Sequence, residues 1–254
     1  MKTKIILCGA CGKMGGNVLS LLAGDNEATA VCGVDLFPKE IAIPVYKSFA
    51  EVKEEADVII DFSSAENLEE RLQFAKNRGM GIVLASTGFT EKDLALIDEY
   101  AKSVAIFKTA NLSLGVNLME SLIKAAASVL GDNFDVEIIE RHHNLKKDAP
   151  SGTALMLADA VNAAFEEKKD IVNGRAGIVG ARTKKEIGMH AVRGGTIVGE
   201  HEVMFAGEDE IITITHSARS KRVFAVGAIR AAKFVSGKAA GRYEMKDLLA
   251  EENE

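Results

Sequence analysis

Short apolar runs and helical patterns alternate along the first 110 residues of this chain. The apolar runs predict strands at residues 5–8, 28–34, 57–62, 81–85 and 104–107. Helical periodicity lies between them, most clearly at residues 66–77 and 90–102. Repeated strand–helix units build a parallel sheet with helices on both faces. The sequence therefore predicts an α/β fold with a Rossmann-like, doubly wound sheet.

The first predicted strand leads into a glycine-rich loop with G-x-x-G-x-x-G spacing, and a helical pattern follows the loop. Such glycines allow a tight turn and let a pyrophosphate approach the amides at the helix start. This spacing is a weak signal alone, but the second strand ends in an acid, which can bind the ribose of NAD. The predicted cofactor residues are Gly9, Ala10, Cys11, Gly12, Lys13, Met14 and Asp35.

Residues 140–160 carry more chemically active side chains than any other stretch. His142 and His143 suit proton transfer near neutral pH, and Lys146 supplies a cation. Ser151 fits the N-cap of a helix, whose first amides form an anion site. Separately, such histidines are usually solvated and such a serine is usually only a cap. Together within twelve residues they indicate an acid–base site for an anionic substrate.

This stretch, E-x-H-H-x-x-K-x-D-A-P-S-G-T-A from Glu140, strongly resembles the signature of the dihydrodipicolinate reductase family of lysine and diaminopimelate biosynthesis. A second family motif, R-G-G-T-I-V-G-E-H, starts at Arg193. The S-T-G-F loop from Ser86 and the A-N-L-S-x-G-V-N loop from Ala110 are also similar to family loops. The chain departs from the family's S-R-x-x-F motif at Lys221, where an arginine is expected, so a substrate role there is in doubt.

The resemblance implies NAD(P)H-dependent reduction of 4-hydroxy-tetrahydrodipicolinate, a cyclic dicarboxylate, to tetrahydrodipicolinate. It implies that His142 is the proton donor and that Lys146 assists it. It assigns the substrate's carboxylates to His143, Ser151, Gly152 and Thr153. It places the nicotinamide half of the cofactor against Ala85, Ser86, Thr87, Thr109, Ala110, Asn111 and Leu112. It also implies a homotetramer joined through the sheet of a second domain.

Two domains are expected. Residues 1–113 are expected to form the dinucleotide-binding domain, and the family resemblance implies that residues 221–254 complete it. Residues 114–220 are expected to form the substrate-binding and oligomerisation domain. The boundary precedes a long apolar helix at residues 114–130. Strands at 135–140, 190–193, 196–205 and 210–216 and a helix at 153–166 predict an α+β domain with an open, mostly antiparallel sheet. Residues 168–188 are expected to be irregular.

The cofactor preference follows from Asp35. The resembled family often has an arginine beside this acid that can hold the 2′-phosphate of NADP, but here Leu36 follows, and Lys39 is the nearest cation in sequence. A carboxylate repels a 2′-phosphate. The sequence therefore predicts that the enzyme prefers NADH to NADPH, or at least uses NADH well.

Composition narrows the function classes. A net charge of −6 argues against nucleic acid as the main partner. Neither a signal peptide nor a long apolar span is evident, so a cytoplasmic chain without membrane contact is expected. A metal site is not expected, because adjacent histidines seldom bind one ion. Two alternatives stay open: a non-catalytic NAD(H)-sensing regulator, and another dehydrogenase of an amino-acid pathway.

Overall fold

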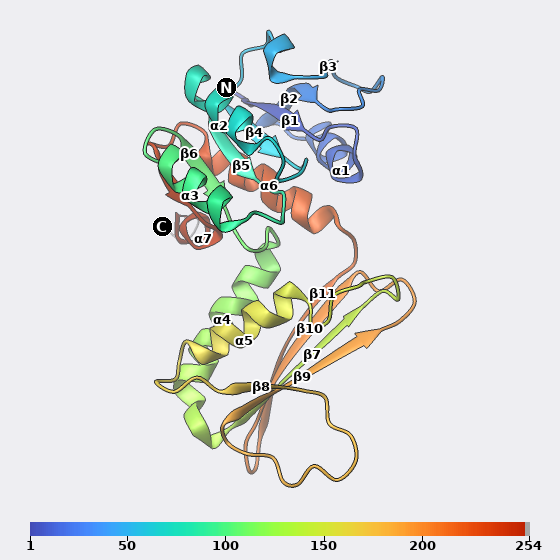
Figure 1. The fold of residues 1–254 in the computed structure, drawn as a ribbon, viewed down its shortest axis with the longest axis vertical. Helices are drawn as coiled ribbons and strands as arrows, with labels where there is room; N and C mark the ends of the chain where they lie inside the picture. The colour runs from blue at the N-terminus through green and yellow to red at the C-terminus, as the bar shows by residue number, and fades with distance from the viewer. Residues whose placement is uncertain (252–254) are drawn as a thin grey trace. The chain divides into compact units, whose positions relative to one another are not determined.

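The structure is a computed structural model, it describes residues 1–251, and it divides the chain into two compact units. Unit 1 consists of Met1–Ser113 and the segment that begins at Arg222, and unit 2 consists of Leu114–Lys221. Figure 1 shows both units, with labels on most of their helices and strands. Each unit is described by itself.

Unit 1 contains a parallel sheet of seven strands in the order β12-β6-β5-β4-β1-β2-β3. The strands are β1 (Thr3–Cys8), β2 (Ala28–Val34), β3 (Val45–Tyr46), β4 (Val58–Asp61), β5 (Gly81–Leu84), β6 (Ala105–Lys108) and β12 (Gly241–Tyr243). Its central strands are buried almost throughout, because helices cover both faces of the sheet. The predicted Rossmann-like fold class is confirmed.

The helices of unit 1 are α1 (Lys13–Leu22), α2 (Leu68–Arg78), α3 (Glu91–Tyr100), α6 (Arg222–Val235) and α7 (Met245–Glu251). Helices α2 and α3 share one core with the sheet, which includes Leu72, Ile82 and Ile97. Helix α6 packs against α1 and against β4, β5 and β6, so the end of the chain completes this unit (Figure 1). Gly227 lets α6 come close to the backbone of the loop after β6, since a Cβ there would lie 1.8 Å from the carbonyl oxygen of Leu112.

Three elements at the sheet edges differ from the sequence prediction. Residues 39–56 were expected to be a polar connection with a short helix, but they contain strand β3 besides the 3₁₀ helix η1 (Phe49–Glu51). The C-terminal tail forms β12 and α7. Strands of two or three residues carry no measurable periodicity, and they form here because they pair with the backbone of β2 and β6.

Unit 2 contains a five-stranded sheet in the order β11-β10-β7-β9-β8. The strands are β7 (Asp135–His142), β8 (Asp170–Asn173), β9 (Glu186–Arg193), β10 (Gly199–Ala206) and β11 (Ile211–Ala218). Two pairings are antiparallel, but β7–β9 and β8–β9 are parallel, so the sheet is mixed rather than mostly antiparallel. The predicted irregular segment contains β8 and the start of β9. Helix α5 connects β7 to β8, and residues 174–185 connect β8 to β9 without a helix; both connections return the chain in the parallel direction.

Helices α4 (Leu114–Leu130) and α5 (Gly152–Asn162) cover one face of this sheet (Figure 1). Met119 and Ile123 of α4 and Leu157 of α5 share a core with the inward residues of the strands. Strand β7 alternates between buried and half-buried positions, so Val136, Ile138, Glu140 and His142 all point toward the helices. A carboxylate and a histidine therefore enter the covered side of the sheet.

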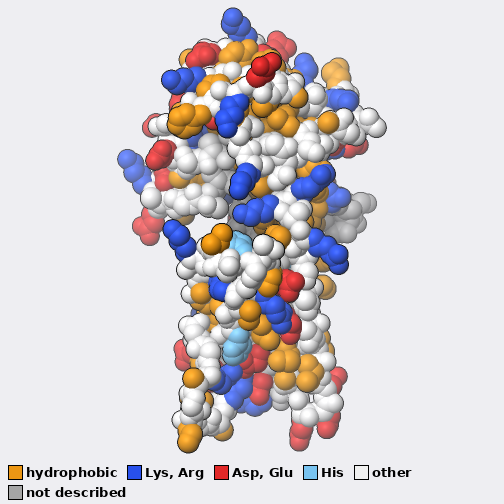
Figure 2. All heavy atoms as spheres, turned by 90° about the vertical axis from the view of Figure 1, so that its right-hand side faces the viewer, with side chains coloured by type: hydrophobic (Ala, Val, Ile, Leu, Met, Phe, Trp, Pro, Cys, Tyr) orange, Lys and Arg blue, Asp and Glu red, His pale blue; other side chains and the backbone are white. Residues whose placement is uncertain are grey.

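The opposite face of the unit 2 sheet carries a charged network. Arg175 and Arg182 both donate to Glu137, and His190 Nε2 lies 2.8 Å from Glu137 Oε2. Burial would raise the pKa of Glu137, but the hydrogen bonds from these three side chains lower it to about 2. In the lower part of Figure 2, acidic and basic side chains and a histidine lie interspersed on the surface of this unit.

Helix α4 and the 3₁₀ helix η2 (Gly131–Asn133) form a 20-residue helical segment that is long and apolar enough to cross a membrane, by length and composition only. This segment differs from the expectation that the chain has no long apolar span. One side of α4, including Met119, Ile123 and Ala127, belongs to the core of unit 2, and 28% of the apolar window is buried; one such helix is weak evidence for a membrane span.

Candidate active site

The glycine loop between β1 and α1 has the geometry of an anion cradle. Gly9 adopts a φ of +76°, which favours glycine, and a Cβ there would lie 2.9 Å from the Phe62 carbonyl oxygen. A Cβ at Gly15 would lie 2.4 Å from the carbonyl oxygen of Ala10. Gly12 is the N-cap of α1 and has no side chain to bond the first amides of the helix. These features fit a pyrophosphate at the start of α1.

Asp35 follows β2 and is bonded to this loop. Its Oδ2 accepts a hydrogen bond from the amide of Cys11 at 3.0 Å, and its Oδ1 accepts one from the amide of Phe37 at 3.0 Å. The carboxylate is thus held beside the glycine loop, where a dinucleotide ribose lies in this fold. Of the predicted cofactor residues, Gly9, Gly12 and Asp35 line one cavity of about 430 Å³. Ala10 is buried, and Lys13 and Met14 are the first residues of α1.

Arg71, which also lines this cavity, belongs to a buried ion pair. Asp61, at the end of β4, is fully buried, and its Oδ2 lies 2.9 Å from Nε of Arg71, which is 5% exposed. The two terminal nitrogens of Arg71 donate to the backbone carbonyls of Ser64 and Glu66 at 2.6 and 2.7 Å. Arg71 therefore fixes the loop after β4, and this loop lines the cavity.

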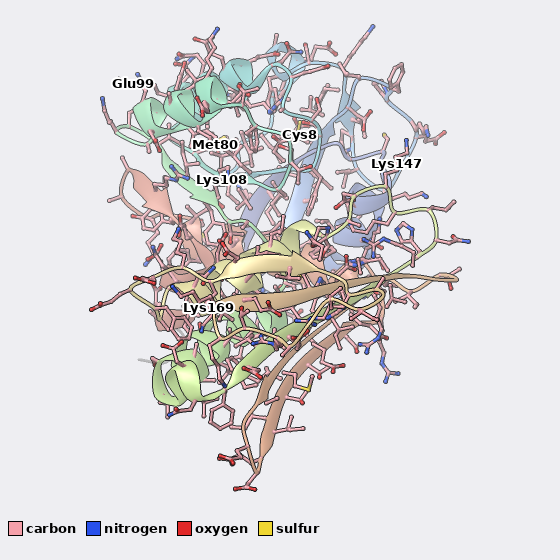
Figure 3. The ribbon with its side chains drawn as sticks, turned by 60° about the horizontal axis from the view of Figure 1, so that its bottom comes forward. Cys8, Met80, Glu99, Lys108, Lys147 and Lys169 are labelled. Atoms are coloured by element: carbon pink, nitrogen blue, oxygen red, sulfur yellow. The ribbon has the colours of Figure 1, made fainter. Side chains whose placement is uncertain are left out.

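The thiol of Cys8 lies at the end of β1, near Asp61 (Figure 3). Burial, with the charge of Asp61, raises the pKa of this thiol to about 12. Cys8 therefore stays protonated at neutral pH and does not act as a nucleophile there.

The predicted nicotinamide loops follow two adjacent strands. Ala85, Ser86 and Thr87 come after β5, and Thr109, Ala110, Asn111 and Leu112 come after β6. Because Leu84 and Lys108 are partners in the β5–β6 pairing, the two loops begin side by side. Lys108, which is labelled in Figure 3, is the last residue of β6. Its Nζ lies 5.6 Å from the ring centroid of Phe89 in the loop after β5, so this contact links the two loops. Burial lowers the pKa of Lys108. These loop residues do not line the 430 Å³ cavity, and their contact with a cofactor stays a prediction.

In unit 2, His142 ends β7 and lies beside a buried carboxylate. His142 Nδ1 lies 2.6 Å from Oε2 of Glu140, which is fully buried. Because an ionised carboxylate only accepts, Nδ1 carries a proton and Nε2 is the atom left for substrate. Glycine at position 199 leaves room there, since a Cβ would come within 3.0 Å of His142 Nε2.

Glu140 holds two further groups in place. Arg193 donates to both of its carboxylate oxygens, at 2.7 and 2.8 Å, and the amide of Ser151 donates to Oε1 at 3.0 Å. Burial would raise the pKa of Glu140, but the hydrogen bonds from Arg193, His142 and Ser151 outweigh it and lower this pKa. The ionised form of Glu140 thus orients the imidazole and the start of α5 together.

The N-terminus of α5 has the predicted cap. Oγ of Ser151 accepts a hydrogen bond from the amide of Ala154 at 3.2 Å, and Gly152 is the first residue of the helix. Oγ of Ser151 also lies 3.1 Å from Nε2 of His201. Burial, together with the nearby charge of His142, lowers the pKa of His201 to about 4. His201 therefore remains neutral at neutral pH and supports the cap.

The loop between β7 and α5 brings the other predicted substrate residues into the same unit. His143 follows His142, and its carbonyl accepts a hydrogen bond from the amide of Lys146 at 3.1 Å. Nζ of Lys146 pairs with Asp148 at 2.8 Å, not with a histidine. Lys147 lies on this loop too (Figure 3). Thr153 lies in the first turn of α5.

The sequence alone assigns no role to Glu140, Arg193 or His201. One signal was available: Glu140 has the same parity as the apolar Val136 and Ile138 of its strand, which predicts a buried carboxylate with partners. The partners themselves require the sheet register, because Arg193 pairs with His142 and His201 pairs with Glu140 across adjacent strands.

Unit 1 carries a loop suited to a dinucleotide, and unit 2 carries an oriented histidine beside a capped helix. These features fit an NAD(P)H-dependent oxidoreductase, and the comparisons with known proteins place the chain in that class. The family models described as dihydrodipicolinate reductase, N-terminus and C-terminus, match residues 3–112 and 115–249. The chain belongs to the dihydrodipicolinate reductase family. Its activity is the reductase activity of that family, and neither the regulator nor the other-dehydrogenase alternative is favoured.

Curated relatives carry the name of the same reductase. The 4-hydroxy-tetrahydrodipicolinate reductase of Caldanaerobacter subterraneus subsp. tengcongensis is 50% identical over 249 residues, which cover 98% of this chain and 99% of the relative. The enzyme of the same name from Clostridium novyi is 43% identical over 252 residues, 99% of this chain and 100% of the relative. The dipicolinate-bound dihydrodipicolinate reductase from Paenisporosarcina sp. TG-14 shares the fold, with a TM-score of 0.80, 24% identity and coverage of 96% of this chain and 98% of that one.

Proposed function

We propose that the chain reduces 4-hydroxy-tetrahydrodipicolinate to tetrahydrodipicolinate with His142 as the proton donor. In the net reaction the substrate loses water and gains a hydride and a proton. Once water has left the ring, a bound nicotinamide would supply the hydride to the ring carbon that is then conjugated with the imine. The chain must then protonate the neighbouring ring carbon of the resulting enamine. The observation that carries this proposal is the 2.6 Å contact between His142 and the buried Glu140, because it orients one imidazole nitrogen for proton transfer.

The remaining predicted residues hold the dianionic substrate. The N-terminus of α5, with Ser151, Gly152 and Thr153, provides oriented amides and a positive helix dipole for one carboxylate. His143 and Lys146 provide the second set of donors, and Lys146 assists His142. Lys146 now pairs with Asp148, an exposed partner that a substrate carboxylate can replace.

A coupled assay tests the function. The enzyme that condenses pyruvate with aspartate semialdehyde generates the substrate in place, and the oxidation of NADH and of NADPH is followed separately. Oxidation that depends on the coupling enzyme supports the proposal. If neither cofactor is oxidised by protein that binds NADH, the proposal is wrong.

The same assay tests cofactor preference. We expect kcat/KM with NADH to equal or exceed the value with NADPH. The carboxylate of Asp35 is fixed at the ribose position, and Glu66 and Glu70 line the same cavity, so a 2′-phosphate meets negative charge. A value of kcat/KM that strongly favours NADPH would overturn this expectation.

The assembly in solution is proposed to be a homotetramer joined through the sheet of unit 2. The outer strand β11 exposes Ile211 and Ile212, and Val192 of β9 is 43% exposed, so apolar side chains remain for a partner subunit to bury. Light scattering coupled to gel filtration should give four times the mass of one chain. A monomeric mass at micromolar concentration would contradict the proposal.

A further inference from the structure

The cavity beside the glycine loop contains a cation that the sequence did not indicate. Lys47 lines this cavity together with Asp35, whereas Lys39, the nearest cation to Asp35 in sequence, does not line it. Lys47 therefore belongs to the surface on which a cofactor ribose would lie, although it is twelve residues from Asp35 in the chain.

The pairing of β2 with β3 explains this position. Val34 and Tyr46 are partners in the parallel register, and the amide of Asp35 donates to the carbonyl of Tyr46 at 3.0 Å. Asp35 and Lys47 are the next residues of the two strands, so their backbones leave the sheet side by side. Lys47 thus stands next to the acid that would bind the ribose hydroxyls.

Asp35, Glu66 and Glu70 also line this cavity, and Lys47 is the cation there that remains available to an anion. Arg71 is the other cationic residue that lines the cavity, and it is bonded to Asp61 and to two backbone carbonyls. Lys47 has an exposed side chain, which takes part in none of the hydrogen bonds or ion pairs found within residues 1–251. Both oxygens of Asp35 are already bonded to backbone amides, which hold that carboxylate toward the glycine loop.

We propose that Lys47 is the residue that binds the 2′-phosphate of NADPH and so lets this chain use NADPH beside Asp35. This inference rests on the proposed function, because it assumes that the ribose lies at Asp35. An ammonium group is a compact donor that suits a phosphate, and it offsets the repulsion from Asp35. The chain therefore accepts both cofactors by a cation on the neighbouring strand, not by a residue next to the acid in sequence.

The test compares Lys47→Met with the matched variant Lys39→Met, which removes an exposed lysine of the same connection outside the cavity. In Lys47→Met, kcat/KM with NADPH should fall about 10-fold, as expected for loss of one charge-assisted hydrogen bond, while the value with NADH changes less than about twofold. Lys47→Arg should keep most of the NADPH activity. Calorimetry should show the same selective loss as a raised Kd for NADPH and an unchanged Kd for NADH.

Two results would overturn the inference: an equal loss with both cofactors, or an NADPH value that matches that of Lys39→Met. Neither result would touch the proposed function, which fails only if the wild-type chain reduces the substrate with neither cofactor. The activity with NADH also reports whether each variant is folded.

Discussion

A His142→Gln enzyme should turn over on the order of 10²- to 10⁴-fold more slowly than the wild type with either cofactor, because it lacks the general acid. Glutamine keeps a donor for Glu140 and similar bulk, so the network around that carboxylate should survive. The affinity for NADH should not change, since the glycine loop and Asp35 belong to unit 1 and His142 belongs to unit 2. The measurements are kcat in the coupled assay and Kd for NADH.

The matched control is His190→Gln. His190 is a histidine of the adjacent strand β9 that pairs with Glu137 on the other face of the same sheet. Its substitution should change kcat by less than about threefold, because His190 lies on the face of the sheet away from His142 and Glu140. Near-normal turnover of His142→Gln, or an equal loss in both variants, would show that His142 is not the proton donor.

An Arg71→Met variant should lose about 3–5 kcal/mol of the free energy of unfolding of unit 1. The substitution leaves the carboxylate of Asp61 fully buried without its cation, and it removes the donors that hold the carbonyls of Ser64 and Glu66. Urea unfolding without cofactor measures the loss. The cofactor should also bind more weakly, because the loop after β4 forms one wall of the cavity.

Two comparisons make this result specific. Lys102→Met removes an exposed partner of Glu99 (Figure 3), and an ion pair of that kind contributes no more than about 1 kcal/mol. The double variant Asp61→Asn/Arg71→Met should recover part of the loss, because it no longer buries an unpaired charge. An Arg71→Met variant as stable as Lys102→Met would show that the buried pair does not stabilise the loop.

Local patterns predicted most of the fold. The seventeen residues of α4 have enough periodicity to mark both of its ends, and the glycine loop with Asp35 is a short-range motif. Strands β3 and β12 could not be predicted, because so few residues carry no pattern and depend on a neighbouring strand. The mixed order of the second sheet depends on the α5 crossover, and no single strand records it.

The candidate site also contains residues that could be predicted from one stretch of sequence and residues that could not. His142, Lys146 and Ser151 lie close together in sequence, so one stretch was enough to predict them. Arg193 and His201 join them only through the register of β9 and β10 with β7. Lys47 lines the cavity beside the glycine loop because of the β2–β3 pairing. Residues that act through a partner on another strand need the sheet before they can be assigned.

The hydrogen bond between Asp35 and the amide of Cys11 limits how the coenzyme preference of this chain can be changed. Removing the acid is the obvious route toward NADPH, yet the same carboxylate accepts a hydrogen bond from the loop that we propose binds the pyrophosphate. An Asp35→Ala enzyme would no longer repel the 2′-phosphate of NADPH, but it would bind both coenzymes more weakly. Redesign is better served by leaving the acid in place and strengthening positive charge on the neighbouring strand.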